Sequence, residues 1–285
     1  MSGTRYHFNG AELDLPLICR GGFQNYNYSA PLPEHIHNTG PEISYVMKGF
    51  TQWQLDSGEL LEQSGGTLAV MPRNLPHRGV EEVLTPCWLF WYILDLRDLE
   101  TARKNTPFTT AEMKLIFEAF ALESCRVLTI SPELARHFSH LLELLRQGKT
   151  KPWFNAEMRL VSTQIILGTV ESLQPHSAAK ADLLVTQARD YMRRHLTANP
   201  SVDNIAAACG LSESQFARRF TREAGITPAD CLQRLRIETA CRVLRESDVS
   251  ITELAFQLGF ATSQYFASVF KRYTGMTPRH WRKSG

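Results

Sequence analysis

The first hundred residues alternate between short apolar runs and turn-forming residues. The runs include 42–49 (EISYVMKG), 51–55 (TQWQL), 67–72 (TLAVMP) and 87–94 (CWLFWYIL), and Gly, Pro, Asn and Asp separate them. Apolar runs of this length with such boundaries are typical of β-strands. Many short strands at this spacing predict a sandwich or a barrel.

A helical period replaces this pattern further along the chain. Apolar residues recur every three or four positions in two stripes, which are Met113, Ile116, Phe117 and Phe120, then Leu134, Phe138, Leu141, Leu142 and Leu145. Such stripes predict amphipathic helices. A third helix is expected around 156–173, and nearly everything from Ala181 to the end has a helical pattern.

One segment interrupts the helices. Residues 174–180 (QPHSAAK) contain Pro, Ser and small residues, which favour a linker. A chain of 285 residues also exceeds a usual single domain. We therefore predict a β-barrel over 1–106, a helical segment over 107–173, a linker over 174–181 and a helical domain over 182–285.

The helical domain contains an internal repeat of about fifty residues. Residues 205–211 match 254–260 at an offset of 49. Four landmarks then recur at an offset of 50, namely Phe216, Phe220, Gly225 and Pro228 with Phe266, Phe270, Gly275 and Pro278. Each copy has a short helix, a turn and a second helix, which is the outline of a helix-turn-helix unit. A single copy is as readily an ordinary helical hairpin, but two copies favour a DNA reader.

A continuous helical pattern from Pro228 to Arg245 joins the two copies. At about 1.5 Å per residue it spans roughly 27 Å, and one turn of DNA is about 34 Å. One chain is therefore expected to enter two successive major grooves on one face of the duplex, at an asymmetric site.

Helical geometry identifies the outward faces of the second helix in each copy. With the two phenylalanines of each copy facing inward, the outward positions are Glu213, Ser214, Ala217, Arg218 and Thr221, then Thr262, Ser263, Gln264, Ala267, Ser268 and Lys271. Arg218 is the strongest candidate for reading a base, since a guanidinium bonds guanine bidentately. Gln264 is the long amide of the second copy, and Arg222, Lys271 and Arg272 are expected to dock on phosphates.

The stretch from about Ala181 to Lys283 resembles the AraC/XylS family of transcriptional regulators. That family has paired helix-turn-helix units ending in the phrase aromatic-x(4)-Gly-x-[ST]-Pro, which this chain carries twice. The resemblance implies a promoter-binding regulator that works with RNA polymerase. It assigns Ser214, Ala217 and Arg218, with Ser263, Gln264, Ala267 and Ser268, to base-facing positions. It also suggests a homodimer, with the Leu134 to Leu145 stripe either forming the seam or covering the open side of the barrel.

The N-terminal region carries a histidine and carboxylate pattern. The spacings H-x-H-x(4)-E-x(6)-G and G-x(5)-P-x(4)-H include His35, His37, Glu42 and His77. They resemble the two motifs of cupins, a barrel that also serves as the sensor domain of AraC-like regulators. Residues two apart in a strand share a face, so these side chains are expected to point together. Three imidazoles and a carboxylate suit Mn, Fe, Ni or Zn, but they also suit hydrogen bonds to an effector or to one another. The sequence departs from the cupin pattern at Ser29, Asn74 and Glu81.

Aromatic residues of the strands are further candidates for effector contact. Trp53, Trp88, Trp91 and Tyr92 suit stacking on a sugar or an aromatic molecule, and they equally suit a core. No Ser/His/Asp triad and no phosphate-binding Gly-rich loop stands out.

Charge and cysteine usage agree with a two-part protein. From Ala181 onward the chain has 15 Lys and Arg against 10 Asp and Glu, a net charge of +5, and the preceding part has 16 against 19, a net charge of −3. A basic tail domain on an acidic partner domain fits nucleic-acid binding. Six scattered cysteines predict reduced thiols. The chain has no run of about 18 apolar residues and no leader pattern, so we expect a cytoplasmic protein without membrane contact.

These observations predict an α+β multidomain protein, with a cupin-like β-barrel followed by helices and a C-terminal all-α tandem helix-turn-helix domain. The expected function is sequence-specific DNA binding controlled by a small effector, such as a sugar, with no required cofactor and no catalysis. A divalent transition metal in the barrel remains an option. Two alternatives stay open: a metal-dependent cupin enzyme, such as a dioxygenase or isomerase, with a helical association tail, and a constitutive DNA-binding protein with a vestigial barrel.

Overall fold

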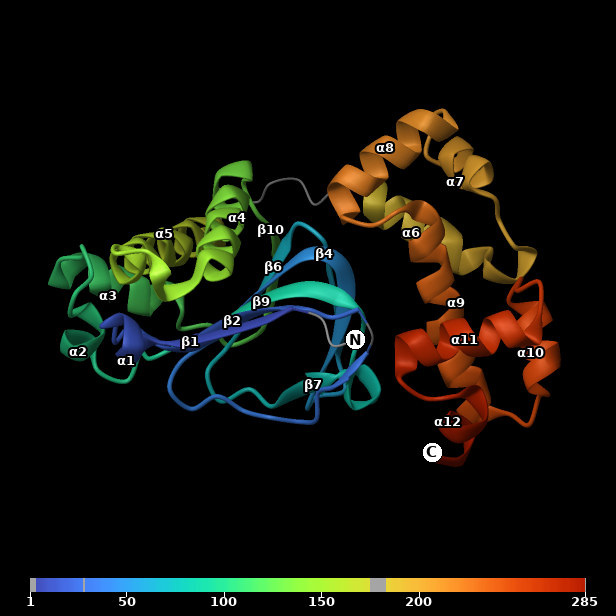
Figure 1. Cartoon of the computed structure of the whole chain (residues 1–285). Helices are drawn as coiled ribbons and strands as arrows, with labels where there is room; N and C mark the ends of the chain where they lie inside the picture. Colours follow the sequence, from blue (N-terminus) through green and yellow to red (C-terminus); the bar gives the residue numbers. More distant parts are fainter. Residues whose placement is uncertain (1–3, 28, 175–182, 285) are drawn as a thin grey trace.

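The computed structural model describes residues 4–27, 29–174 and 183–284. It has a sheet-rich N-terminal domain, which we define as β1 to α5, and a helical C-terminal domain, which we define as α6 to α12 (Figure 1). The two domains lie side by side. Most of the predicted linker, residues 175–181, lies outside the described residues.

An antiparallel sheet organises the N-terminal domain. Its main path runs β1-β2-β9-β4-β6-β10, with β5 and β7 paired to β4, and β3 and β8 form a separate pair. The strands are β1 (Arg5–Asn9), β2 (Ile18–Asn25), β3 (Ala30–Pro31), β4 (Glu42–Leu55), β5 (Leu60–Ser64), β6 (Thr67–Met71), β7 (His77–Gly79), β8 (Val83–Leu84), β9 (Cys87–Leu94) and β10 (Arg126–Thr129). Within the described residues β1 and β10 are the edges of this path and do not pair, so the predicted closed cupin barrel is not confirmed.

The long strand β4 belongs to both halves of the sheet. Its first half pairs with β6 and β9, and its second half pairs with β5 and β7. The pairing register with β9 shifts between Val46 and Lys48, and Gly49 follows with a φ of +91°. A residue with a left-handed backbone conformation next to a β-bulge bends the strand. The bend places Phe50 at the side of the sheet that faces the C-terminal domain.

Helices cover one face of the sheet (Figure 1). They are α1 (Gly10–Leu13), α2 (Leu99–Arg103), α3 (Thr110–Ala119), α4 (Pro132–Gln147) and α5 (Phe154–Leu173). The Phe138 ring of α4 stacks on Tyr45 of the sheet, with the ring centroids 4.3 Å apart. The whole apolar stripe of α4 is buried in the core of the N-terminal domain. It therefore covers the sheet, and the alternative that it forms a dimer seam is wrong.

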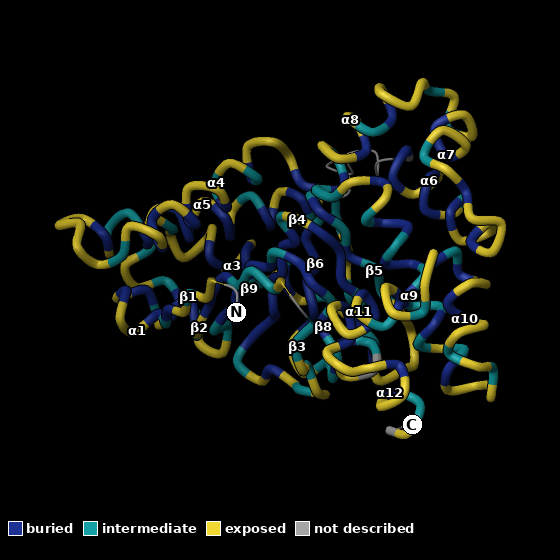
Figure 2. Tube along the Cα trace, turned by 45° about the vertical axis from the view of Figure 1, so that its right-hand side comes forward, coloured by how far each residue is buried: buried dark blue, intermediate teal, exposed yellow. Residues whose placement is uncertain are grey.

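The C-terminal domain contains both predicted helix-turn-helix units. Its helices are α6 (Leu183–Arg194), α7 (Val202–Ala208), α8 (Glu213–Ala224), α9 (Pro228–Glu246), α10 (Ile251–Gln257), α11 (Ser263–Thr274) and α12 (Pro278–Ser284). The two units are α7-α8 and α10-α11, and α9 joins them as predicted. One apolar cluster serves both units, and Figure 2 shows exposed segments surrounding this buried interior.

Candidate functional site

Local signals at both ends define the first recognition helix, α8. The Ser212 side chain caps the start, and Gln215 bonds back to complete a capping box. Gly225 ends the helix with a φ of +68°, which favours glycine because a Cβ is strained there. Phe216 and Phe220 are fully buried, so the intervening positions turn outward. The helix thus presents Ser214 and Arg218 to solvent, together with Glu213, Thr221 and Arg222, while Ala217 is half-buried.

The second recognition helix, α11, repeats this construction. The Thr262 hydroxyl accepts from the Tyr265 N–H at the start, and Gly275 ends the helix with a φ of +77°. Phe266 and Phe270 are fully buried. The exposed candidates are Thr262, Gln264, Ser268, Lys271 and Arg272, and the half-buried ones are Ser263 and Ala267. The structure therefore places every predicted DNA-facing residue on the accessible sides of these two helices.

Helix α9 spaces the two units. It has 19 residues, which corresponds to about 28 Å of helix. The Gln233 side chain of α9 donates to the Tyr265 hydroxyl of α11 at 3.0 Å. Tyr265 is 53% exposed and lies beside the reading positions, although it was not among the residues predicted to face DNA. Its exposure was hard to foresee because an aromatic residue at a helical spacing usually indicates a core position.

Ion pairs hold part of the basic surface in place. Glu223 pairs with Arg219 at 2.8 Å and with Arg222 at 3.1 Å along α8. Arg222 therefore has a carboxylate partner within α8. The Arg272 guanidinium lies 5.4 Å from the Tyr273 ring centroid. These contacts orient Arg222 along α8 and Arg272 along α11.

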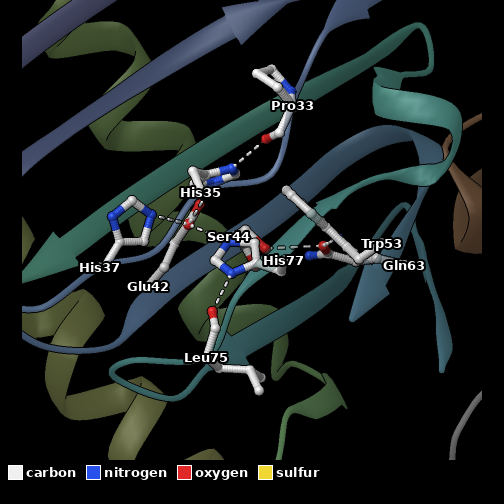
Figure 3. A network of polar contacts seen from close by, with 9 residues as sticks. All are labelled: Pro33, His35, His37, Glu42, Ser44, Trp53, Gln63, Leu75 and His77. Atoms are coloured by element: carbon white, nitrogen blue, oxygen red, sulfur yellow. Dashed lines mark hydrogen bonds and ion pairs between the residues drawn. The ribbon is translucent and has the colours of Figure 1, made fainter. Parts of the chain in front are cut away.

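The predicted histidine cluster forms within the N-terminal domain (Figure 3). The Nε2 atoms of His37 and His77 lie 2.9 and 3.1 Å from Glu42 Oε2, and the His35 Nε2 atom lies 3.9 Å from it. Glu42 begins β4 and His77 begins β7, and an isolated bridge links His35 to His77. The spacing in the sequence thus correctly predicted that these four side chains meet.

Backbone carbonyls fix two of the imidazoles. His35 Nδ1 lies 2.9 Å from the Pro33 carbonyl oxygen, and His77 Nδ1 lies 2.9 Å from the Leu75 carbonyl oxygen. A carbonyl accepts only, so each Nδ1 carries the proton and a neutral ring keeps a lone pair at Nε2. That lone pair points at the Glu42 carboxylate, which is also an acceptor. The cluster therefore needs an added proton or a cation among these atoms.

Electrostatics assign the charge of the carboxylate. Burial acts to raise the pKa of Glu42, but hydrogen bonds from His35, His37 and His77 outweigh it and hold this pKa well below its usual value. The hydrogen bond to Glu42 raises the pKa of His35, although burial acts in the opposite direction. An ionised, buried carboxylate surrounded by imidazoles is a site for positive charge.

The donor set fits a transition metal. Each of the four residues offers one ligand atom, and these atoms lie within 4.8 Å of one another. Nδ1 hydrogen bonds to backbone carbonyls are the usual outer contacts of metal-bound histidines, because they fix the tautomer and the ring orientation. His35, His37, Glu42 and His77 could together hold a divalent ion such as Mn, Fe, Ni or Zn.

A cavity of about 520 Å³ adjoins the cluster. Among its lining residues are His35, His37, Glu42, Trp53 and Trp91. The Trp53 indole is 2% exposed and donates to Gln63 Oε1 at 2.9 Å. Of the other aromatic candidates, Tyr92 is fully buried in the core and Trp88 packs against Lys48 and Phe23. The cavity can therefore receive a small polar molecule beside two indoles and the cluster.

Comparison with known proteins identifies the C-terminal units. Residues 205–284 match the family model described as a helix-turn-helix domain. The C-terminal part of the chain is thus a helix-turn-helix domain.

Within the described residues no helix combines the length and the apolar character needed to span a membrane.

Named relatives include several regulatory proteins. The MmsAB operon regulatory protein of Pseudomonas aeruginosa is 33% identical over 147 residues, covering 51% of this chain and 46% of that protein. The transcriptional activator RhaS of Klebsiella pneumoniae is 28% identical over 128 residues, covering 45% and 46%. The xylose operon regulatory protein of Escherichia coli is 35% identical over 101 residues, covering 35% and 26%. The matches span less than half of the length of each of these relatives.

The solved structures that show similarity to this chain include two bacterial proteins. The C-terminal domain of AraT from Geobacillus stearothermophilus is 26% identical, with a TM-score of 0.35 over 38% of this chain and 89% of that one. ToxT from Vibrio cholerae is 10% identical, with a TM-score of 0.35 over 99% of this chain and 97% of that one.

Proposed function

We propose that this protein is a sequence-specific DNA-binding transcriptional regulator of the AraC type, which acts on promoter DNA in the cytoplasm and is not an enzyme. The observation that carries the proposal is the pair of helix-turn-helix units, each with an exposed reading face, joined by the continuous helix α9. About 28 Å of helix between the units suits entry into successive major grooves, which are about 34 Å apart.

The two recognition helices have different roles in this proposal. Arg218 of α8 reads a guanine through its guanidinium, with Ser214 and Ala217 beside it. In α11 Gln264 reads an adenine. Among the remaining candidates, the cationic residues Arg222, Lys271 and Arg272 contact phosphates. The acidic Glu213 and the short side chains of Thr262, Ser263, Ala267 and Ser268 complete the contact surface. The α11 unit therefore contributes more to positioning than to discrimination.

The cavity of the N-terminal domain binds the effector, a small polar molecule such as a sugar. His35, His37, Glu42, His77 and Trp53 contact that molecule. Alternatively, the three histidines and Glu42 would hold a divalent metal ion, which would supply Lewis-acid binding of an effector oxygen. The loop between β2 and β3 supports a link to DNA binding. Tyr26 of this loop, Pro31 of β3 and the adjacent Leu32 line the cavity. The Ser29 N–H of the loop donates to the Arg272 carbonyl of α11 at 3.4 Å.

A second copy of the chain and RNA polymerase are the proposed protein partners. With the α4 stripe buried, exposed apolar residues along α5 and at its N-cap support dimerisation. Trp153, the N-cap, and Leu160 and Leu167 of the helix are 73%, 63% and 43% exposed and recur at intervals of seven. This spacing is typical of helices that pack as a coiled coil. Sedimentation should show a dimer that Leu160→Gln with Leu167→Gln converts to a monomer. A wild-type monomer would exclude the dimer.

A footprint tests DNA binding. Promoter fragments enriched from a random pool by the full chain should show protection in two adjacent major grooves per chain. Failure of the pool to enrich would contradict the proposal. A thermal-shift screen of the full chain against sugars, aromatic acids and amines tests the effector, because a bound ligand stabilises the folded state by RT ln(1 + [L]/Kd).

A further inference from the structure

Both recognition helices end against the N-terminal domain. At the end of α8, a Cβ on Gly225 would lie 2.9 Å from the Lys48 Cα and 3.1 Å from the Met47 carbonyl oxygen. At the end of α11, a Cβ on Gly275 would lie 3.2 Å from the Ser29 hydroxyl oxygen. These glycines occupy equivalent positions of the repeat. The N-terminal domain therefore contacts the C-terminal end of the second helix in both DNA-reading units, and it does so at two different places on its own surface.

The N-terminal domain also holds the helix that joins the units. Arg234 of α9 is 7% exposed, and its guanidinium donates to the Pro86 carbonyl oxygen at 2.6 Å. A buried hydrogen bond from a charged group contributes about 1.5 to 3 kcal/mol. Pro86 lies beside β9, so this contact connects the centre of the DNA-binding domain to the sheet.

Phe50 is the apolar centre of this contact. It is 2% exposed, and its ring lies 4.7 Å from the Arg189 guanidinium of α6 and 5.2 Å from that of Arg234. Glu62 of β5 completes the arrangement by pairing with Arg189 at 3.0 Å and with Arg193. Desolvated cation–π contacts favour a fixed ring orientation. The bend of β4 at Gly49 places Phe50 next to these two cations.

We propose that Phe50 and Glu62 are positioning residues for DNA recognition. Through them the N-terminal domain clamps α6 and α9. Together with the contacts at the ends of α8 and α11, this clamp fixes the separation of the two recognition helices. The reading faces remain exposed in this arrangement, so the clamp sets their geometry without covering them. The consequence for DNA rests on the proposed function, but the fixed separation does not.

The separation is measured without DNA in the full chain. Donor and acceptor dyes are attached through an azide-bearing amino acid at the positions of Glu213 and Gln264, the exposed starts of α8 and α11. Single-molecule energy transfer should give one narrow distance distribution in the otherwise unchanged chain. Phe50→Ala and Glu62→Gln should broaden or shift it, since each loosens the clamp.

Two variants control for general loss of stability. Phe8→Ala removes another buried phenylalanine of the N-terminal domain, and Glu12→Gln removes an ion pair with Lys149 in that domain. Both should leave the distribution unchanged. An unchanged distribution in folded Phe50→Ala overturns the clamp. If near-ultraviolet circular dichroism shows Phe50→Ala unfolded, Glu62→Gln decides in the same way.

A second arm tests the consequence for DNA. One base pair, about 3.4 Å of helix, is inserted between the two protected grooves of a selected site. The unchanged chain should lose affinity by about tenfold or more, and Phe50→Ala by clearly less. Equal losses in both proteins would show that the clamp does not set spacing on DNA. A pool that never enriches would refute the proposed function, while the distance distribution still decides the clamp.

Discussion

At the scale of single residues, His77 gives the strongest indication of what the N-terminal cluster binds. Its two ring nitrogens face acceptors on both sides, the Leu75 carbonyl oxygen and Glu42 Oε2. A neutral imidazole has one donor and one acceptor nitrogen, so it cannot satisfy both contacts. Either the ring carries a second proton or a cation shares the space with the carboxylate. This choice separates a metal site from a hydrogen-bonding effector site.

Metal addition should distinguish the two. In the full chain, Mn²⁺, Ni²⁺ or Zn²⁺ at about 100 times Kd should raise the free energy of unfolding by about 2.7 kcal/mol. A chelator should reverse the rise in Tm, and His37→Gln should remove it because one ligand is lost. His7→Gln, which alters a histidine outside the four-residue cluster, is the matched control. A wild-type Tm that no divalent ion changes would leave the cluster as a hydrogen-bonding site.

Arg218 and Arg222 of α8 should behave differently towards DNA. Arg218→Ala should cost about 1 to 3 kcal/mol and relax specificity at one base pair, because a bidentate contact to guanine is lost. Arg222→Ala should weaken binding to all sequences. It should also reduce the slope of the logarithm of affinity against the logarithm of salt concentration by about one. Competition binding on selected and scrambled duplexes at several salt concentrations measures both. Uniform weakening by Arg218→Ala would instead make Arg218 a phosphate contact.

At the scale of elements, local signals were predictable and non-local pairing was not. The capping residues Ser212 and Thr262 and the glycines that end α8 and α11 act within a few positions, so the repeat showed both units. The strand β10, at 126–129, pairs with β6 about sixty residues away, in a segment whose sequence pattern predicted only helices. The open sheet and the buried α4 stripe likewise depend on which surfaces meet. An apolar stripe alone does not show whether its partner is the same chain.

The buried stripe of α4 gives a prediction about stability. Leu141 is fully buried against the sheet and α5, so Leu141→Ala should lower the free energy of unfolding by about 2 to 5 kcal/mol through the cavity it leaves. The oligomeric state should not change. Chemical denaturation and sedimentation of the same preparations measure the two effects. Dissociation of a dimer without loss of stability would restore the seam to α4.

At the scale of the whole molecule, a charged layer separates the two domains. Glu62 on the N-terminal side pairs with Arg189 and Arg193, and Glu238 of α9 lies near these two arginines and Arg234. Burial, together with the Glu62 charge, raises the pKa of Glu238 to about 7 against the opposing charges of Arg189, Arg193 and Arg234. The Glu238 Oε1 atom is buried without a hydrogen-bond partner within the described residues. Neutral pH therefore lies within the range where this contact layer changes its charge.

Removing the charge of Glu238 should change how stability depends on pH. An acid whose pKa is higher in the folded state binds a proton more tightly there. The protonated Glu238 therefore makes its full contribution to the free energy of unfolding at pH values below the unfolded pKa of about 4.5, and this contribution is lost as the pH rises to about 7. Glu238→Gln stays neutral throughout. Its stability relative to wild type should therefore rise across this window, by at most about 3 kcal/mol, and level off above it. Calorimetric Tm values between pH 5 and 8 measure the difference, with Glu246→Gln, exposed on the same helix, as the control. A difference that does not vary with pH would show that Glu238 stays ionised in the folded protein.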